Sequence, residues 1–112
     1  MIAQPHVEVL WWRGCPSWEE AIALTREEMA AAGLDPGELT VTEIETEDAA
    51  EAEGMPGSPT IRVEGKDIQP PGDNPVGLTC RVYRRRDGRT SPLPDRADVR
   101  DALANPMERG DP

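Results

Sequence analysis

The sequence predicts a single α/β domain with the element order β, α, β, α, β, β, α. Three observations predict it: an apolar segment at residues 6–12, an amphipathic helix directly after it at 16–32, and a strand at 60–63 that is entered through a proline. At 112 residues the chain has room for one core and not for two. We expect the domain to span residues 1–104 and a loose tail to occupy 105–112.

The first two elements follow from side-chain type and spacing. Residues 6–12 are almost continuously apolar after Glu8, as in an interior strand that is covered on both faces. Pro16 suits the first turn of a helix, where its missing N–H is not needed. Apolar residues then recur at intervals of three and four, which predicts one buried helical face. That face comprises Trp18, Ile22, Thr25, Met29 and Ala32.

The later elements are shorter. We expect an edge strand at 39–46, where β-branched residues alternate imperfectly, and an acidic helix at 47–53. A strand at 67–69 should pair with the one at 60–63, and a last helix should begin at Asp95 or Asp98 and reach Leu103. A long proline-rich loop at about 70–94, with one strand-like patch at 78–83, separates the sheet from that helix.

The charge balance excludes one class of partner. The formal net charge of -10 argues against sequence-independent binding of nucleic acid, which requires a basic surface. The charge is uneven, because residues 1–79 contain 4 basic and 16 acidic side chains and residues 80–112 contain 8 and 6. One interpretation is that the basic cluster contacts an anion or the acidic stretch 43–53. The other is that its side chains are solvated or paired within the chain. The cluster consists of Arg81, Arg84, Arg85, Arg86 and Arg89.

The longest apolar run, at residues 9–12, is far too short to cross a membrane, so no membrane contact is expected. The N-terminal residues lack the features of a secretory signal. Two cysteines do not make a disulfide-rich secreted scaffold, so the predicted location is the cytoplasm.

Two motifs carry a resemblance to a known fold. Cys15-Pro16 stands at the junction of the first strand and helix, and Ser58-Pro59-Thr60 opens the third strand. Together with the element order, they resemble the thioredoxin fold, which implies a three-layer βαβαββα sandwich. The segments 57–65 and 77–83 are similar to small bacterial thioredoxin-family or alkylmercury-lyase-like proteins. Trp18 occupies the position of the second cysteine of a Cys-x-x-Cys motif, so the ordinary dithiol cycle within one turn is unavailable.

Cys15 is the main candidate for a reactive thiol. A helix N-terminus stabilises a thiolate, and we expect Cys15 to be exposed there. Ser17 and Glu20 have capping-box spacing, which would place Cys15 outside the helix, and an unreactive, inherited cysteine is the alternative.

Cys80 has three possible roles. It is the only candidate within the chain for a thiol that resolves a mixed disulfide on Cys15. The alternation of Leu78, Cys80 and Val82 also fits a strand face that packs inward, with a buried cysteine. The third possibility is a ligand for a soft metal or an organomercurial.

The resemblance implies that Pro59 follows a cis peptide bond and that the backbone of Ser58 faces Cys15, where it would hold an incoming peptide or thiol. A trans proline that begins an ordinary strand is the alternative. No cofactor is expected, and two cysteines with one histidine are too few for a structural zinc site. His6 starts the first strand, far from Cys15, and is expected at the surface. The expected substrate-binding residues are Trp12, Gly14, Pro16, Trp18, Ser58 and Pro59.

The leading functional hypothesis is thiol-disulfide exchange through Cys15, with a thiol-bearing protein or a small-molecule thiol as the partner and Cys80 or an external thiol as the resolving group. Such a protein could be an enzyme, a thiol-disulfide oxidoreductase. A binding module without catalytic activity and the handling of soft metals by both thiolates are the alternatives.

Overall fold

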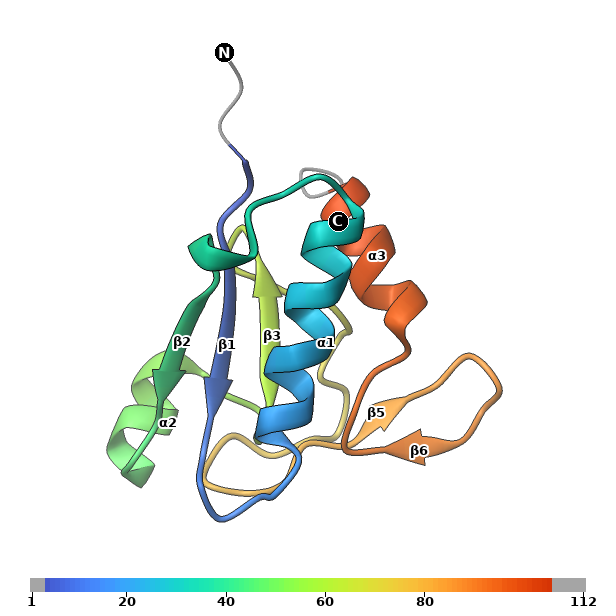
Figure 1. Ribbon diagram of the computed structural model, residues 1–112. Helices are drawn as coiled ribbons and strands as arrows, with labels where there is room; N and C mark the ends of the chain where they lie inside the picture. Colours follow the sequence, from blue (N-terminus) through green and yellow to red (C-terminus); the bar gives the residue numbers. More distant parts are fainter. Residues whose placement is uncertain (1–3, 106–112) are drawn as a thin grey trace.

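The computed structural model describes residues 4–105 and contains a four-stranded mixed sheet in the order β2-β1-β3-β4 (Figure 1). β1 (Val7–Trp11) lies in the interior, parallel to β2 (Thr40–Glu43) and antiparallel to β3 (Thr60–Val63). β4 (Lys66–Asp67) pairs antiparallel with β3. The predicted interior position of the first strand and edge position of the second are confirmed.

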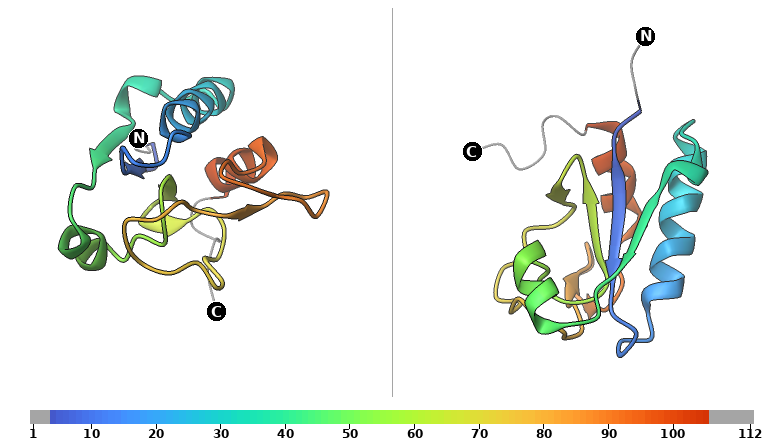
Figure 2. Two further views of the ribbon diagram at one scale, coloured as in Figure 1. Left: turned by 90° about the horizontal axis from the view of Figure 1, so that it is seen from below. Right: turned by 90° about the vertical axis from the view of Figure 1, so that its left-hand side faces the viewer.

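Helices cover both faces of this sheet. α1 (Trp18–Ala31) and α3 (Arg96–Ala104) pack on one face, and α2 (Glu47–Glu53) lies on the other (Figure 2). Successive strand side chains point to opposite faces, so β1 contributes to two apolar clusters. Val9 packs with residues of α1 and α3, whereas Leu10 packs beneath α2. The predicted α/β class is therefore confirmed.

α1 is shorter than predicted at its N-terminus. Ser17 is the N-cap residue, but its side chain makes no hydrogen bond to the helix, so the capping box with Glu20 does not form. Ile22, Thr25 and Met29 are buried as predicted, whereas Ala32 is exposed. The predicted face is thus correct except at Ala32, which is the C-cap residue that follows the helix.

One buried residue of α1 is charged. Glu28 lies on the face that packs against α3, and its carboxylate is 3.0 Å from Nε of Arg100 and 3.5 Å from Arg96. A buried carboxylate is tolerated when it is paired in this way. The contact ties α1 to α3 across the face of the sheet.

The region predicted as a loop contains a small hairpin. β5 (Tyr83–Arg84) and β6 (Thr90–Ser91) pair with each other and project away from the main sheet (Figure 1). The predicted strand-like patch at 78–83 overlaps β5 only at Tyr83. Leu78 and Thr79 form a bend, and residues 80–82 are bonded to Ser58 and to side chains, as described below.

Smaller differences concern the connections. A single 3-10 turn, η1 (Pro36–Glu38), lies where the sequence predicts a turn. The predicted tail at 105–112 falls outside the described residues apart from Asn105. Within residues 4–105, no helix is both long enough and apolar enough to cross a membrane.

Candidate functional site

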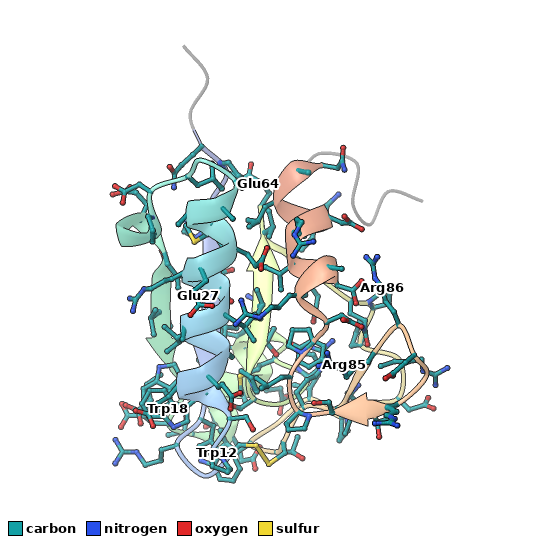
Figure 3. The ribbon with its side chains drawn as sticks, turned by 45° about the vertical axis from the view of Figure 1, so that its right-hand side comes forward. Trp12, Trp18, Glu27, Glu64, Arg85 and Arg86 are labelled. Atoms are coloured by element: carbon teal, nitrogen blue, oxygen red, sulfur yellow. A yellow bond between two sulfur atoms is a disulfide. The ribbon has the colours of Figure 1, made fainter. Side chains whose placement is uncertain are left out.

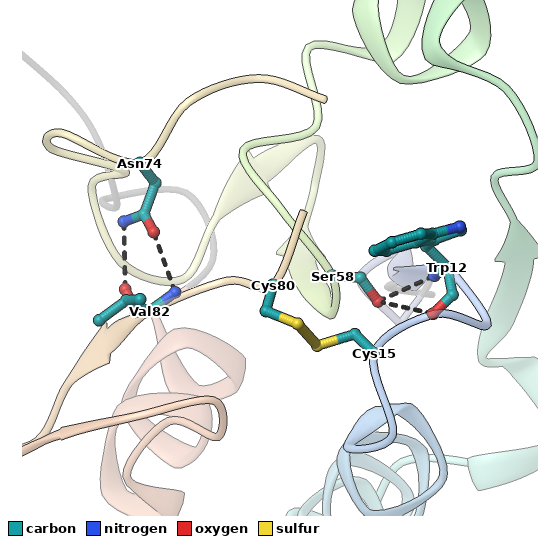
Figure 4. The surroundings of a disulfide bond; sticks show 6 residues. All are labelled: Trp12, Cys15, Ser58, Asn74, Cys80 and Val82. Carbon is teal, nitrogen blue, oxygen red and sulfur yellow. Dashed lines mark hydrogen bonds between the residues drawn. A yellow bond between two sulfur atoms is a disulfide. The ribbon is translucent and has the colours of Figure 1, made fainter. Parts of the chain in front are cut away.

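Cys15 and Cys80 are joined in a disulfide bond, with their Cα atoms 5.6 Å apart (Figure 4). This separation lies within the usual range for disulfides. Cys15 lies in the connection between β1 and α1, and Cys80 lies in the extended segment before β5. The fold therefore joins two cysteines that are 65 positions apart in the sequence. The structure therefore supports the interpretation in which Cys80 is the disulfide partner of Cys15.

The expectation that Cys15 is exposed is wrong. Cys15 is only 1% exposed, because the Cys80 segment lies over it. Its N–H donates a hydrogen bond to the carbonyl of Trp12 at 3.1 Å, which closes a turn between the end of β1 and the helix. The sulfur lies just ahead of the first turn of α1, as the sequence predicts, but in the disulfide-bonded form it does not face solvent.

The predicted inward face of the Cys80 segment is wrong for Cys80 and Val82, whereas Leu78 is partly buried against the cluster beneath α2. Cys80 is exposed and Val82 is 48% exposed, whereas Arg81 and Tyr83 are almost completely buried. The alternation is real, but the side chains that face inward are the larger and more polar ones. The physical reason is that both terminal nitrogens of the Arg81 guanidinium find acceptors inside the protein, although its buried Nε makes no hydrogen bond.

Arg81 forms a buried clasp with β4 and the residues after it. Its guanidinium donates two hydrogen bonds to the carboxylate of Asp67, at 2.8 and 3.1 Å, and a third to the carbonyl of Gln69 at 3.0 Å. The guanidinium carbon also lies 4.3 Å from the centre of the Tyr83 ring. A planar guanidinium suits bidentate pairing and stacking of this kind. This clasp fixes the residue that directly follows Cys80.

Tyr83 provides a second buried anchor. Its hydroxyl donates a hydrogen bond to the carbonyl of Pro59 at 2.7 Å, and its side chain lies in the main core. Burial raises the pKa of Tyr83 well above its usual value, and the nearby positive charge of Arg81 only partly opposes this. The neutral phenol therefore holds the segment to the Ser58-Pro59 turn.

Ser58 pairs with the Cys80 segment through its main chain. Its N–H donates to the carbonyl of Thr79 at 2.7 Å, and its carbonyl accepts from the N–H of Arg81 at 2.8 Å, which forms a parallel β-bridge opposite Cys80. The peptide bond between Ser58 and Pro59 is cis, as the resemblance implies. The Ser58 hydroxyl accepts a hydrogen bond from the N–H of Trp12 at 2.8 Å (Figure 4). Ser58 thus connects both cysteine segments.

Gly57 permits this close approach. Its φ is +104°, and a Cβ atom there would lie 2.8 Å from the Cα and N atoms of Arg81. Glycine adopts such a conformation without steric cost. The backbone of the turn and the backbone of the Cys80 segment are therefore in direct contact.

The carboxamides of Asn74 and Gln69 make hydrogen bonds to the main chain of this segment that a neighbouring strand would otherwise make. Asn74 donates to the carbonyl of Val82 at 3.1 Å and accepts from its N–H at 2.9 Å. Gln69 makes the same pair of contacts with Arg84, at 2.9 and 2.7 Å. The polar backbone of the segment is satisfied without regular pairing, which explains why most of the patch is not assigned as a strand.

Two surface grooves meet at the disulfide. The smaller, of about 340 Å³, is lined by both cysteines, Pro16, Val82 and Pro92 among others. The larger, of about 750 Å³, is lined by Cys80 but not by Cys15, and it extends over the proline-rich loop at 70–75. Cys80 therefore forms part of the wall of both grooves.

Trp12 and Trp18 lie at the end of the domain where α1 begins (Figure 3). The rings of Trp18 and Trp11 stack with their centres 3.9 Å apart, against the main core. Trp12 is half-buried, and its indole lies against the exposed Gly14, where a Cβ atom would lie 2.3 Å from the ring. Of the predicted substrate-binding residues, Pro16 lines the smaller groove, whereas Trp12, Gly14 and Trp18 line neither of the two.

The basic cluster is mainly paired within the chain. Arg85 lies 3.5 Å from Asp95, and Arg86 contacts two carboxylates of α3 at 2.9 and 2.6 Å. Arg81 is buried in its clasp. These contacts favour the prediction of an intramolecularly paired face, and they do not involve the acidic stretch 43–53.

Sequence reasoning missed Arg81, Asp67, Asn74 and Gln69 as residues that build the site. The alternation in the segment carried a usable signal, because it places either Cys80 or Arg81 inward, but choosing between them requires knowing that Asp67 lies opposite. His6 is exposed, as predicted. Among the described residues, no group of three or more His, Cys, Asp or Glu side chains could hold a metal ion.

No family model, no curated protein and no solved structure matches the chain. The interpretation of the site therefore depends on its geometry.

Proposed function

We propose that this chain is a thioredoxin-like thiol-disulfide exchange protein and that Cys15 and Cys80 form its reactive pair. The observation that carries the proposal is a disulfide between cysteines 65 positions apart, at the wall of two surface grooves. In the oxidised form the pair would accept two electrons from two external thiols. These thiols would leave as a disulfide, and both cysteines would become thiols.

The arrangement of elements supports the thioredoxin-like part of the proposal. The strand order β2-β1-β3-β4, a helix directly after β1 and a cis-proline turn beside the cysteine are what the resemblance implies. Trp18 replaces the second cysteine of the usual motif. Cys80, which comes from a distant part of the chain, would take over its role.

The main alternative is a purely structural disulfide in a binding module. In the chain-entropy model, a cross-link across 65 residues stabilises a protein by about 4 kcal/mol, so stability alone could explain the bond. Structural disulfides are rare in a reducing compartment. A structural bond would therefore fit an oxidising compartment rather than the predicted cytoplasm, whereas an exchange function is compatible with the cytoplasm.

The reduction potential of the pair separates these alternatives. The protein would be equilibrated with defined ratios of glutathione and glutathione disulfide, and the oxidised fraction measured after an acid quench. We expect a potential between about −180 and −270 mV, as in exchange proteins, whereas a value below about −300 mV would identify a structural bond and contradict the proposal. Cys15→Ser and Cys80→Ser serve as controls that cannot form the bond.

A further inference from the structure

The two cysteines differ sharply in accessibility. Cys15 is 1% exposed, and Cys80 is exposed and lines both grooves. A thiolate that attacks a disulfide approaches along the line of the S–S bond, from the side opposite the leaving sulfur. Cys80 and Asn74 both line the larger groove, which Cys15 does not line, and the Cys80 end of the disulfide is the one on the side of Asn74 (Figure 4). The more accessible residue of the pair is therefore Cys80.

The main-chain edge beside Cys15 is already occupied. Both hydrogen-bonding groups of Ser58 are used by the chain itself, through the carbonyl of Thr79 and the N–H of Arg81. An incoming peptide cannot pair with Ser58 while this segment is in place. The role that the resemblance implies for Ser58, holding a partner against Cys15, is thus filled from within the chain.

The disulfide is not the only bond that holds this segment. The Arg81 clasp, the Tyr83 hydroxyl and the carboxamide of Asn74 all anchor it without the sulfur atoms. Buried, bidentate ion pairs and buried hydrogen bonds are costly to break. We therefore expect the segment to stay in place after reduction and to keep Cys15 covered.

From these contacts we propose that Cys80 is the sulfur with which external partners react, and that Cys15 is the internal thiol that leaves or resolves. This inference rests on the proposed exchange function and reverses the roles expected from the sequence. The partner is any thiol or disulfide able to reach the larger groove, and it does not use Ser58 as a docking edge.

In the reducing direction, the reaction converts the internal disulfide into two thiols and two external thiols into a disulfide. A partner thiolate attacks Sγ of Cys80, the bond to Cys15 breaks, and its electron pair stays on Sγ of Cys15, which takes a proton from solvent. A second external thiolate then attacks the partner's sulfur in the mixed disulfide, which releases the partner disulfide and the Cys80 thiolate.

In the oxidising direction, the Cys80 thiolate attacks a partner disulfide and releases one partner thiolate. The Cys15 thiolate then attacks Sγ of Cys80, which re-forms the internal bond and releases the second partner thiolate. Two electrons pass from the cysteine pair to the partner.

The first test locates the mixed disulfide in the wild-type protein. The oxidised chain would be mixed with excess glutathione for a short time, quenched with acid and digested, and the glutathione adduct assigned by peptide mass. We expect the adduct on Cys80. An adduct mainly on Cys15 would overturn the inference, and this test does not depend on whether any variant folds.

The second test compares the single-cysteine variants. The rates of reaction with glutathione disulfide would be measured over a range of pH, so that each rate constant refers to the thiolate. We expect Cys80 in the Cys15→Ser protein to react about tenfold or more faster than Cys15 in the Cys80→Ser protein. Equal rates, or a faster Cys15, would contradict the inference.

A third variant tests whether the segment itself covers Cys15. Asn74→Ala in the Cys80→Ser background should raise the reactivity of Cys15, because it removes two contacts that hold the segment. Asn105→Ala, at an exposed asparagine after α3, is the matched control and should have no effect. If the wild-type pair exchanges but Cys15 carries the adduct, this inference fails alone. If the potential is that of a structural bond, the proposed function fails.

Discussion

The two halves of the cysteine pair are held in place by different means. Cys15 lies between a central strand and the longest helix, so regular backbone hydrogen bonding fixes its position. Cys80 lies in an extended segment that is held by a buried arginine, a tyrosine hydroxyl and two carboxamides. A few specific side chains thus hold Cys80 in place where secondary structure does not. We therefore expect single substitutions in the Cys80 segment to lower the free energy of unfolding more than substitutions around Cys15.

The largest expected effect is that of Arg81→Ala. Removing a buried guanidinium leaves the Asp67 carboxylate without its bidentate partner, and we expect the free energy of unfolding to fall by about 3–5 kcal/mol. Urea unfolding of the oxidised protein measures this change. Arg84→Ala, at the exposed arginine of the same hairpin, is the control and should change stability by no more than about 0.5 kcal/mol. Similar losses in both variants would show that the clasp is not what holds the segment.

A smaller loss is expected from Gly57→Ala. The added Cβ would lie 2.8 Å from the backbone of Arg81 and the residue would keep φ near +104°, so overpacking and backbone strain together should cost about 3 kcal/mol. Gly65→Ala is the matched control. Its φ is also positive, at +78°, but no atom lies within 4 Å of the new Cβ, and the expected cost is about 1 kcal/mol. Equal costs would mean that the contact between the turn and the Cys80 segment can relax freely.

The smallest effect concerns pH. Tyr83 is the only tyrosine, and burial raises its pKa above the value of about 10 that it has in an unfolded chain. The neutral phenol thus contributes stability that is fully present below about pH 10 and is lost as the pH rises above it, by about 1.4 kcal/mol per pH unit. Urea unfolding at several alkaline pH values should show this slope, and tyrosinate absorbance should appear only as the protein unfolds.

The control for this prediction is Tyr83→Phe, which keeps the ring in the core and removes the ionisable group. In this variant, the free energy of unfolding should no longer show the decrease above about pH 10 that is due to Tyr83. Tyrosinate absorbance in the folded wild-type protein at about the pH of an ordinary tyrosine would contradict the buried position of the hydroxyl.

Elements whose signal is local could be predicted from the amino-acid sequence alone. The apolar run of β1 and the periodic face of α1 could be predicted because burial of a strand or helix leaves a regular pattern along the chain. The acidic α2 was predictable from its composition and from Gly54, which ends it in the left-handed conformation. The position of Cys15 just before α1 was predictable for the same reason. The exposure of Cys15 was not, because the segment that covers it is 65 positions away.

The face of the Cys80 segment that points inward depends on contacts with residues distant in the sequence, and these are seen only in the tertiary structure. The alternating pattern allowed two registers, and in the absence of a partner the apolar register with Cys80 inside was the reasonable choice. Asp67 reverses that choice, since a buried arginine is stable only with a carboxylate opposite it. The pairing of the cysteines follows from this register, because it turns Cys80 outward, over Cys15.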